Sequence, residues 1–202
     1  MPDPMTVSNS SCLIALDLVG RLDLLHDLYG TVLVPCAVSY ECGSSLPSWI
    51  RVQPIQNQGM ARSLQIGLGA GESEAIVLAT ETSAVRLILD DKKARHIAQQ
   101  LGLPITGTLA VLLRAKQQRL IPNLRDVLDD LAAVDFRISD ALVEDALRRA
   151  GEYIFVPAMF PPGLPARGAC ATPSGLAMGA GSLTQGARTY RVPGLRCATP
   201  SA

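Results

Sequence analysis

Short β-prone runs and amphipathic helical patterns alternate along the first three quarters of the chain. The second run, 31–34, has apolar or β-branched side chains throughout, which is typical of a strand covered on both faces in a parallel sheet. Five such runs are candidate strands, at residues 5–8, 31–34, 52–55, 85–89 and 103–105. Their spacing leaves room for a helix after almost every strand.

Helical spacing of apolar residues fills the intervals between these runs. The cluster Asn9-Ser10-Ser11 can cap the first helix, and Pro35 suits the first position of the third. The predicted helices cover residues 13–19, 22–28, 35–43, 60–66, 72–82, 92–101, 108–118, 124–133 and 139–150. Strands that alternate with helices predict an α/β fold, a three-layer sandwich with a parallel sheet between two helical layers.

Polar residues directly follow three of the predicted strands. Ligands of such sheets gather at the carboxyl ends of the strands. That rule selects Asn9, Asp90, Asp91, Thr106 and Thr108. Carboxylates that share one place repel each other unless a cation neutralises them, and hard oxygen donors suit Mg²⁺ or Mn²⁺.

Two acids in predicted helices, Glu41 and Glu74, could lean over the same edge. Glu72 is a lesser candidate, because side chains two positions apart on a helix point ~200° apart. Each acid also has a purely structural interpretation: acids favour the first turn of a helix, and either Asp90 or Asp91 can be an N-cap. We favour Asp91 slightly over Asp90 for the site.

Basic residues near this edge are interpreted mainly as solvated helix positions: Lys92, Lys93 and Arg95. The sequence contains no Gly-x-x-x-x-Gly-Lys-Ser/Thr loop and no Gly-x-Ser-x-Gly elbow. The glycine-rich segment 67–71 lacks a lysine and is a weak nucleotide signal. Another class of α/β phosphoryl-transfer enzyme would need a phosphate loop that is missing here.

Charge divides the chain near residue 152. Residues 1–152 carry 14 basic and 18 acidic side chains, a net charge of −4, whereas the last 50 residues carry four arginines and no acid. Those 50 residues include 7 Gly and 7 Pro and repeat Cys-Ala-Thr-Pro-Ser. We expect a domain at 5–152 and a low-complexity, largely disordered tail at 153–202, with a functional basic arm as the alternative.

Cysteine usage and hydropathy point to a reducing compartment. The five cysteines form no Cys-x-x-Cys pair and histidines number only two, so a zinc site of the usual kind is not expected. No apolar run approaches the ~20 residues that span a bilayer, and the first residues lack the basic flank of a signal peptide. We expect a cytoplasmic protein with no membrane partner.

Four ordered motifs carry a resemblance to a known family. Val-Ser-Asn-Ser-Ser-Cys-Leu-Ile-Ala-Leu at 7–16 resembles the opening of PIN domains. Leu-Gly-Ala-Gly-Glu-Ser-Glu-Ala-Ile-Val-Leu-Ala at 68–79 is similar to the central helix of a VapC-like subfamily. The runs at 87–95 and 105–112 resemble its next two strand-to-helix junctions, and 136–152 fits its closing stretch. The resemblance covers residues 5–152.

The resemblance implies a Mg²⁺- or Mn²⁺-dependent endoribonuclease, typically the toxin of a toxin–antitoxin pair. Its metal ligands would be Asn9, Glu41, Glu74, Asp90 and Asp91, of which Glu41, Glu74 and Asp91 would also be catalytic. Ser10, Thr106 and Thr108 would contact the substrate. The implied partners are an RNA substrate, an antitoxin protein and a second copy of the chain in a homodimer.

Asn9 departs from the family pattern, which places its first acid there. An amide oxygen can ligate Mg²⁺ but brings no negative charge, so the departure weakens the expected metal affinity. The alternative is a PIN-like module that has lost its metal and serves in binding or regulation.

Overall fold

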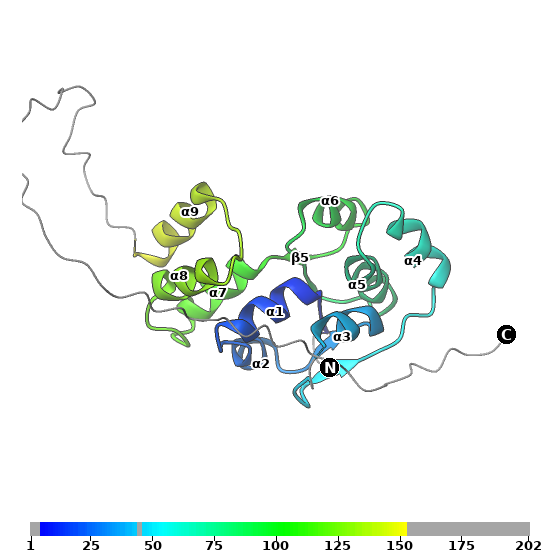
Figure 1. Ribbon diagram of the computed structural model, residues 1–202, viewed down its shortest axis with the longest axis horizontal. Coiled ribbons are helices and arrows are strands. Elements are labelled where there is room, and N and C mark those ends of the chain that lie inside the picture. The colour runs from blue at the N-terminus through cyan, green and yellow to red at the C-terminus, as the bar shows by residue number, and fades with distance from the viewer. Residues whose placement is uncertain (1–4, 44–45, 153–202) are drawn as a thin grey trace, which may run out of the picture. The chain divides into compact units, whose positions relative to one another are not determined.

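The computed structural model describes residues 5–43 and 46–152 of the chain. The predicted low-complexity segment 153–202 lies outside the described residues, as do two of the five cysteines, Cys170 and Cys197. Figure 1 shows the order of the elements along the chain.

A five-stranded parallel sheet forms the centre of the domain. The strands are β1 (Thr6–Ser8), β2 (Val32–Val34), β3 (Ile50–Val52), β4 (Arg86–Ile88) and β5 (Ile105–Thr106). They lie in the order β3-β2-β1-β4-β5, and every neighbouring pair is parallel. Because β1 is the central strand, the residue that follows it lies between the ends of β2 and β4.

Helices cover both faces of the sheet, which confirms the predicted three-layer α/β sandwich. One layer contains α1, α2, α7, α8 and α9, and the other contains α4, α5 and α6. The helices of the described residues are α1 (Ser10–Leu18), α2 (Asp23–Tyr29), α3 (Cys36–Cys42), α4 (Gln58–Gln65), α5 (Ala70–Glu81), α6 (Lys92–Gln100), α7 (Thr108–Gln117), α8 (Leu124–Ala133) and α9 (Asp140–Ala150). Helix α3 packs against both α1 and α5, and lies between them in Figure 1.

Successive side chains along each central strand point to alternate faces of the sheet, which explains why a hydrophobic core forms on each face. Val32 and Val34 are fully buried in the cluster under α1, while Leu33 belongs to the cluster under α5. Strand β4 divides in the same way, with Ile88 on the first face and Leu87 on the second. Successive side chains of a strand point to opposite faces, so a run that is apolar throughout must be covered twice.

The third strand lies earlier in the chain than predicted, at Ile50–Val52 instead of 52–55. The amide of Gln53 donates to the carbonyl of Val34 (2.9 Å), and Pro54 then has no amide with which to continue the ladder. Apolar content around Ile55 suggested a strand, but Ile55 packs in the core after the strand has ended.

The two helices that follow begin earlier than expected, because their N-cap residues, Asn57 and Gly69, lie earlier in the chain than the predicted starts. Helix α4 starts at Gln58, where the side chain of Asn57 accepts a hydrogen bond from the amide of Met60 (2.9 Å). Helix α5 starts at Ala70, two residues before the predicted start at Glu72, with Gly69 as its N-cap. Glu72 and Glu74 therefore lie within the first five residues of α5.

Glu152 joins the end of the described chain to the start of α8. Its carboxylate accepts hydrogen bonds from the amides of Leu124 (2.8 Å) and Arg125 (2.9 Å) and pairs with Lys116 at 2.6 Å. Burial alone would raise the pKa of this carboxyl, but the hydrogen bonds and the Lys116 charge outweigh burial and lower the pKa below its ordinary value.

We expect Glu152→Gln to lower the free energy of unfolding by about 1–2 kcal/mol at pH 7, since the capped amides and Lys116 lose a charged acceptor. A lowered pKa in the folded state stabilises the protein above the pKa of unfolded glutamate, about 4.3, and this gain disappears as the pH falls through the folded-state pKa. Urea unfolding of the parent and the variant at pH 7 and at pH 3 measures the loss of unfolding free energy at each pH. The exposed Glu144→Gln is the control. An equal deficit at both pH values would contradict the prediction.

No helix in residues 5–43 or 46–152 is both long enough and apolar enough to span a membrane.

Candidate functional site

Asn9 follows the central strand and is fully buried. Its backbone amide donates to the carbonyl of Ile88 (3.1 Å), which ties it to the end of β4. It occupies the N-cap position of α1, where an Asn oxygen usually accepts from the amides of the first turn, yet its side chain makes no such bond. Both polar atoms of the side chain, Oδ1 and Nδ2, are buried without a hydrogen-bond partner. A buried amide in this state costs free energy unless a ligand completes it.

Glu41 brings α3 to the same edge. Its Oε2 accepts a hydrogen bond of 2.5 Å from the hydroxyl of Ser10, the residue after Asn9. Its Oε1 accepts from the amide of Gly71 at the start of α5 (3.0 Å). Helix N-termini favour negative charge, so this placement stabilises the carboxylate. The structure thus joins Glu41 of α3 to Ser10 of α1, the residue directly after Asn9.

Gly71 permits this contact. A Cβ atom at position 71 would overlap the carboxylate of Glu41, whose Cδ would lie 2.9 Å away. The glycine-rich segment 67–71 therefore has a steric role here, since it lets an acid from α3 reach the backbone of α5.

Glu74 faces the other end of α3. Its Oε2 accepts a hydrogen bond from the amide of Ala37 (2.9 Å), in the first turn of that helix. The predicted ligand thus has a structural role in the described residues, as a cap supplied by a neighbouring helix. Glu72 turns back on its own helix, and its carboxylate lies against Gly69.

Asp90 and Asp91, which follow β4, have different hydrogen-bond partners. Asp90 is half-buried, and its carboxylate accepts from both the amide (2.8 Å) and the hydroxyl (2.5 Å) of Thr108. Asp91 is exposed and caps α6 by accepting from the amide of Ala94 (2.8 Å). The sequence left open which of the two is the cap. The geometry makes Asp90 the better candidate for the site, whereas Asp91 was slightly favoured from the sequence.

Two of the three predicted substrate-binding hydroxyls, those of Ser10 and Thr108, donate hydrogen bonds to the carboxylates of Glu41 and Asp90. Ser10 orients Glu41 and Thr108 orients Asp90, so each carboxylate is held by one backbone amide and one hydroxyl. Thr106 lies in β5, where its carbonyl accepts from the amide of Leu89 (2.9 Å). Such support fixes the direction of a carboxylate before any ligand arrives.

Three of the five cysteines, Cys12, Cys36 and Cys42, lie in the described residues. Burial raises the pKa of Cys12, the Asp90 charge raises it further, and a hydrogen bond with Thr108 counters this only in part. Burial, followed by the charges of Glu41 and Asp17, raises the pKa of Cys42 to about 11. Cys12 and Cys42 therefore stay protonated near neutral pH and are poor nucleophiles.

The oxygen donors at this edge are of the chemical type that hard divalent cations bind. In the part of the chain that the structure describes, no three His, Cys, Asp or Glu side chains gather closely enough to hold a metal by themselves. Mg²⁺ usually keeps several waters and takes only one or two carboxylates from the protein. The orphaned oxygen of Asn9 with the oriented carboxylates of Glu41 and Asp90 would be a donor set of that kind.

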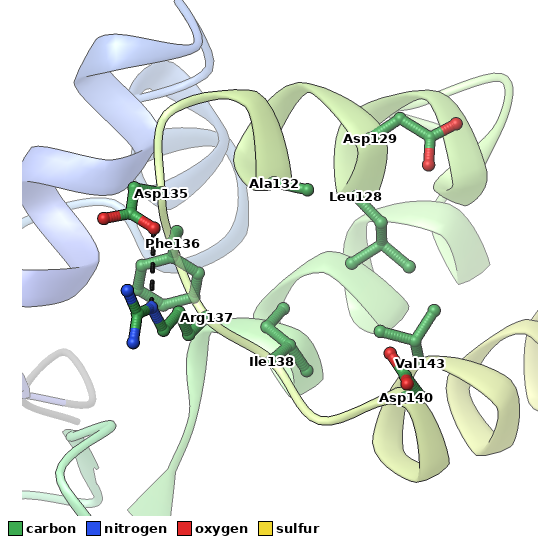
Figure 2. A pocket seen from close by; sticks show the side chains of 9 residues that line it. All are labelled: Leu128, Asp129, Ala132, Asp135, Phe136, Arg137, Ile138, Asp140 and Val143. Carbon is green, nitrogen blue, oxygen red and sulfur yellow. Dashed lines mark hydrogen bonds and ion pairs between the residues drawn. The ribbon is translucent and has the colours of Figure 1, made fainter.

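Two hollows of the described surface border the loop between α8 and α9. One of about 460 Å³ lies between α8, α9 and the loop that joins them, and Figure 2 shows Phe136, Ile138 and Val143 on its wall. A second, of about 430 Å³, shares that loop and reaches Ser10. Neither is lined by Asn9, Glu41 or Asp90.

Comparison with protein families agrees with the α/β fold described above. A family model described as a PIN domain matches residues 5–152. The chain belongs to the PIN-domain family. The family match spans the same residues as the sandwich, and PIN domains are generally nucleases, so this PIN domain has a nuclease-type fold. No curated protein matches the chain.

Sequence reasoning missed one side chain at the edge of this PIN domain. Arg95 was interpreted as a solvated helix residue, but it is half-buried and its Nη1 donates to the carbonyl of Leu89 (3.3 Å). The sequence feature that could have indicated this position is Gly107, directly after the last strand. The guanidinium of Arg95 occupies the space that a side chain at position 107 would fill.

Proposed function

We propose that this PIN-domain protein is a metal-dependent endoribonuclease that hydrolyses RNA phosphodiesters at the carboxyl edge of its sheet. The observation that carries the proposal is Asn9, a fully buried side chain at the end of the central strand with both polar atoms unpartnered. The sheet topology places such a residue where ligands of parallel sheets bind. Membership of a nuclease family supplies the class of reaction.

Asn9, Glu41 and Asp90 would hold Mg²⁺ or Mn²⁺ at this edge. A bound divalent ion lowers the pKa of a coordinated water and neutralises charge on a phosphate. Ser10 and the Gly71 amide keep both oxygens of Glu41 in place, and Thr108 does the same for Asp90. Because these contacts exist before substrate binds, the carboxylates need little reorganisation during the reaction. Glu74 supports the arrangement by holding the start of α3.

The biological role that we propose is the toxin of a toxin–antitoxin pair, on the basis of the VapC-like motifs at 68–79 and 87–95. Its partners would be an RNA substrate, an antitoxin protein and a second copy of the chain. An antitoxin arginine could pair with the acids of the site, since guanidinium groups bind carboxylates in bidentate fashion.

The direct test is cleavage of a labelled cellular RNA pool by the purified full chain with Mg²⁺, with Mn²⁺ and with EDTA. The proposal expects cleavage that needs the divalent ion. Cleavage that persists in EDTA would exclude the metal-dependent mechanism.

Asn9→Asp is expected to lower the stability of the metal-free protein and to raise its affinity for a divalent cation. Without a cation the new carboxylate is buried and unpartnered, so the free energy of unfolding should fall by about 1–3 kcal/mol. With Mn²⁺ the added charge strengthens binding, so the variant should gain more thermal stability than the parent, and cleavage should rise about tenfold. Thermal unfolding with and without Mn²⁺, beside the RNA assay, measures both effects.

Asn57→Asp is the matched control, because Asn57 is also an N-cap but is exposed and already hydrogen-bonded. It should show no Mn²⁺-dependent difference from the parent. An equal Mn²⁺ shift in the parent, Asn9→Asp and Asn57→Asp would argue against a metal at Asn9.

A second candidate function is a PIN-like binding or regulatory module without catalysis. Two observations favour it: the amide at position 9, and the lack of a three-acid cluster in residues 5–43 and 46–152. It expects no RNA cleavage by the parent and no Mn²⁺ binding heat by calorimetry.

A further inference from the structure

Arg95 extends from α6 over the end of the sheet. It is the fourth residue of the helix, and its Nη1 donates to the carbonyl of Leu89, directly before Asp90. A Cβ atom at Gly107 would lie 2.5 Å from this Nη1 and 3.1 Å from Oδ1 of Asp90. The guanidinium and the carboxylate therefore lie over the same stretch of backbone at the ends of β4 and β5.

The guanidinium of Arg95 is anchored at this edge by a backbone carbonyl and not by a carboxylate. Within the described residues Arg95 forms no ion pair, although Asp90 is close. Asp90 directs its oxygens to the amide and hydroxyl of Thr108 instead. One donor of Arg95 binds Leu89, which leaves most of its five N–H groups for another acceptor.

The strand order places this cation on one side of the proposed site. Asn9 follows the central strand, Asp90 follows β4 and Gly107 follows the outermost strand, β5. Neighbouring strands lie ~4.8 Å apart, so the ends of β1 and β5 are separated by about 10 Å. A single RNA strand that lies across the strand ends can place one phosphate near Asn9 and the next near Arg95.

We propose that Arg95 binds the phosphate adjacent to the cleaved one, on the β5 side of the site. This inference rests on the proposed ribonuclease function and adds a second phosphate subsite to it. A guanidinium suits the task because its planar fork binds two phosphate oxygens at once. The acidic centre repels a polyanion, and a fixed cation beside it sets the register of the strand.

Charge-neutral RNA linkages test the subsite. A short RNA containing one mapped cleavage site is prepared in three forms: unmodified, with a methylphosphonate one linkage 5′ of that site, and with one on the 3′ side. We expect the parent protein to lose about tenfold to a hundredfold in kcat/KM with one of the two modified RNAs, the size of a charge-assisted hydrogen bond. Arg95→Ala should lose a similar factor with unmodified RNA and nothing further with that modified RNA.

Neighbouring charge is controlled with Lys93→Ala. Lys93 lies two residues before Arg95 on the same helix, so its side chain leaves the helix about 200° away from that of Arg95. Its Nζ lies 2.8 Å from where a Cβ of Gly67 would be. This variant should keep the full methylphosphonate effect. Arg95→Lys should keep part of it, because the charge remains and the fork is lost. Thermal unfolding of every variant verifies the fold.

The results separate the subsite from the nuclease assignment. If the parent cleaves RNA but Arg95→Ala retains its full sensitivity to both neutral linkages, the subsite is wrong and the ribonuclease proposal stands. If the parent cleaves no RNA with Mg²⁺ or Mn²⁺, both proposals fall.

Discussion

Glu41→Gln is expected to reduce RNA cleavage by about a hundredfold or more while the domain remains folded. The substitution keeps the size of the side chain and an oxygen that can accept from the amide of Gly71. It removes the negative charge that would hold a divalent cation beside Asn9. The Ser10 hydroxyl can rotate to accept from the new amide, so the free energy of unfolding should change by less than about 1 kcal/mol.

Two measurements check this expectation. The first is cleavage of labelled RNA in Mg²⁺, compared with Glu144→Gln, a control at an exposed position of α9. The second is bacterial growth on induced expression, which the parent should slow and Glu41→Gln should not if the protein is a toxin. Cleavage by Glu41→Gln within threefold of the parent would remove Glu41 from the proposed site.

Gly71→Ala is expected to lower cleavage at least tenfold without unfolding the protein. The new methyl group would occupy the place of the Glu41 carboxylate, which must move away from the Gly71 amide and the Ser10 hydroxyl. That carboxylate is the end of a flexible side chain, so the steric cost is small. Alanine also favours a helix over glycine by about 1 kcal/mol, which offsets part of the loss.

The matched control is Gly59→Ala in α4. A Cβ at Gly59 would lie 3.5 Å from Oδ1 of Asn57, an ordinary contact, so this variant should gain a little stability and keep its cleavage rate. Thermal unfolding and RNA cleavage of the two variants are measured together. If Gly71→Ala cleaves RNA like the parent, the position of the Glu41 carboxylate does not matter for the reaction.

The centre of the fold could be predicted from local patterns because β1, β2 and β4 each show in sequence that both of their faces are covered. Val32, Leu33 and Val34 are apolar in succession, and the structure buries them on alternate faces. The same logic predicted β4 and the helices on either side. It failed at β3, where Pro54 ends the ladder before the apolar residue at 55, and where a long-range hydrogen bond to Val34 sets the register.

The site was readable only in part. The ends of β1 and β4 follow from the strand pattern, so Asn9 and the Asp90–Asp91 pair could be selected from the sequence. Which aspartate faces the site depends on the Thr108 amide and hydroxyl, 18 residues away. Which glutamate reaches Ser10, the residue after Asn9, depends on the absence of a side chain at Gly71, which no local rule reveals.

The amino-acid sequence alone determined the α/β sandwich, the carboxyl edge as the place of the polar residues and the set of acids from which a site could be built, because periodicity and burial are properties of neighbouring positions. Only the tertiary structure decided that Glu74 and Asp91 cap helices and that Glu41 and Asp90 are held by hydroxyls. It also decided that Arg95 lies near Asp90. Those choices depend on hydrogen bonds and close contacts between elements, and side-chain direction across such distances is set by packing.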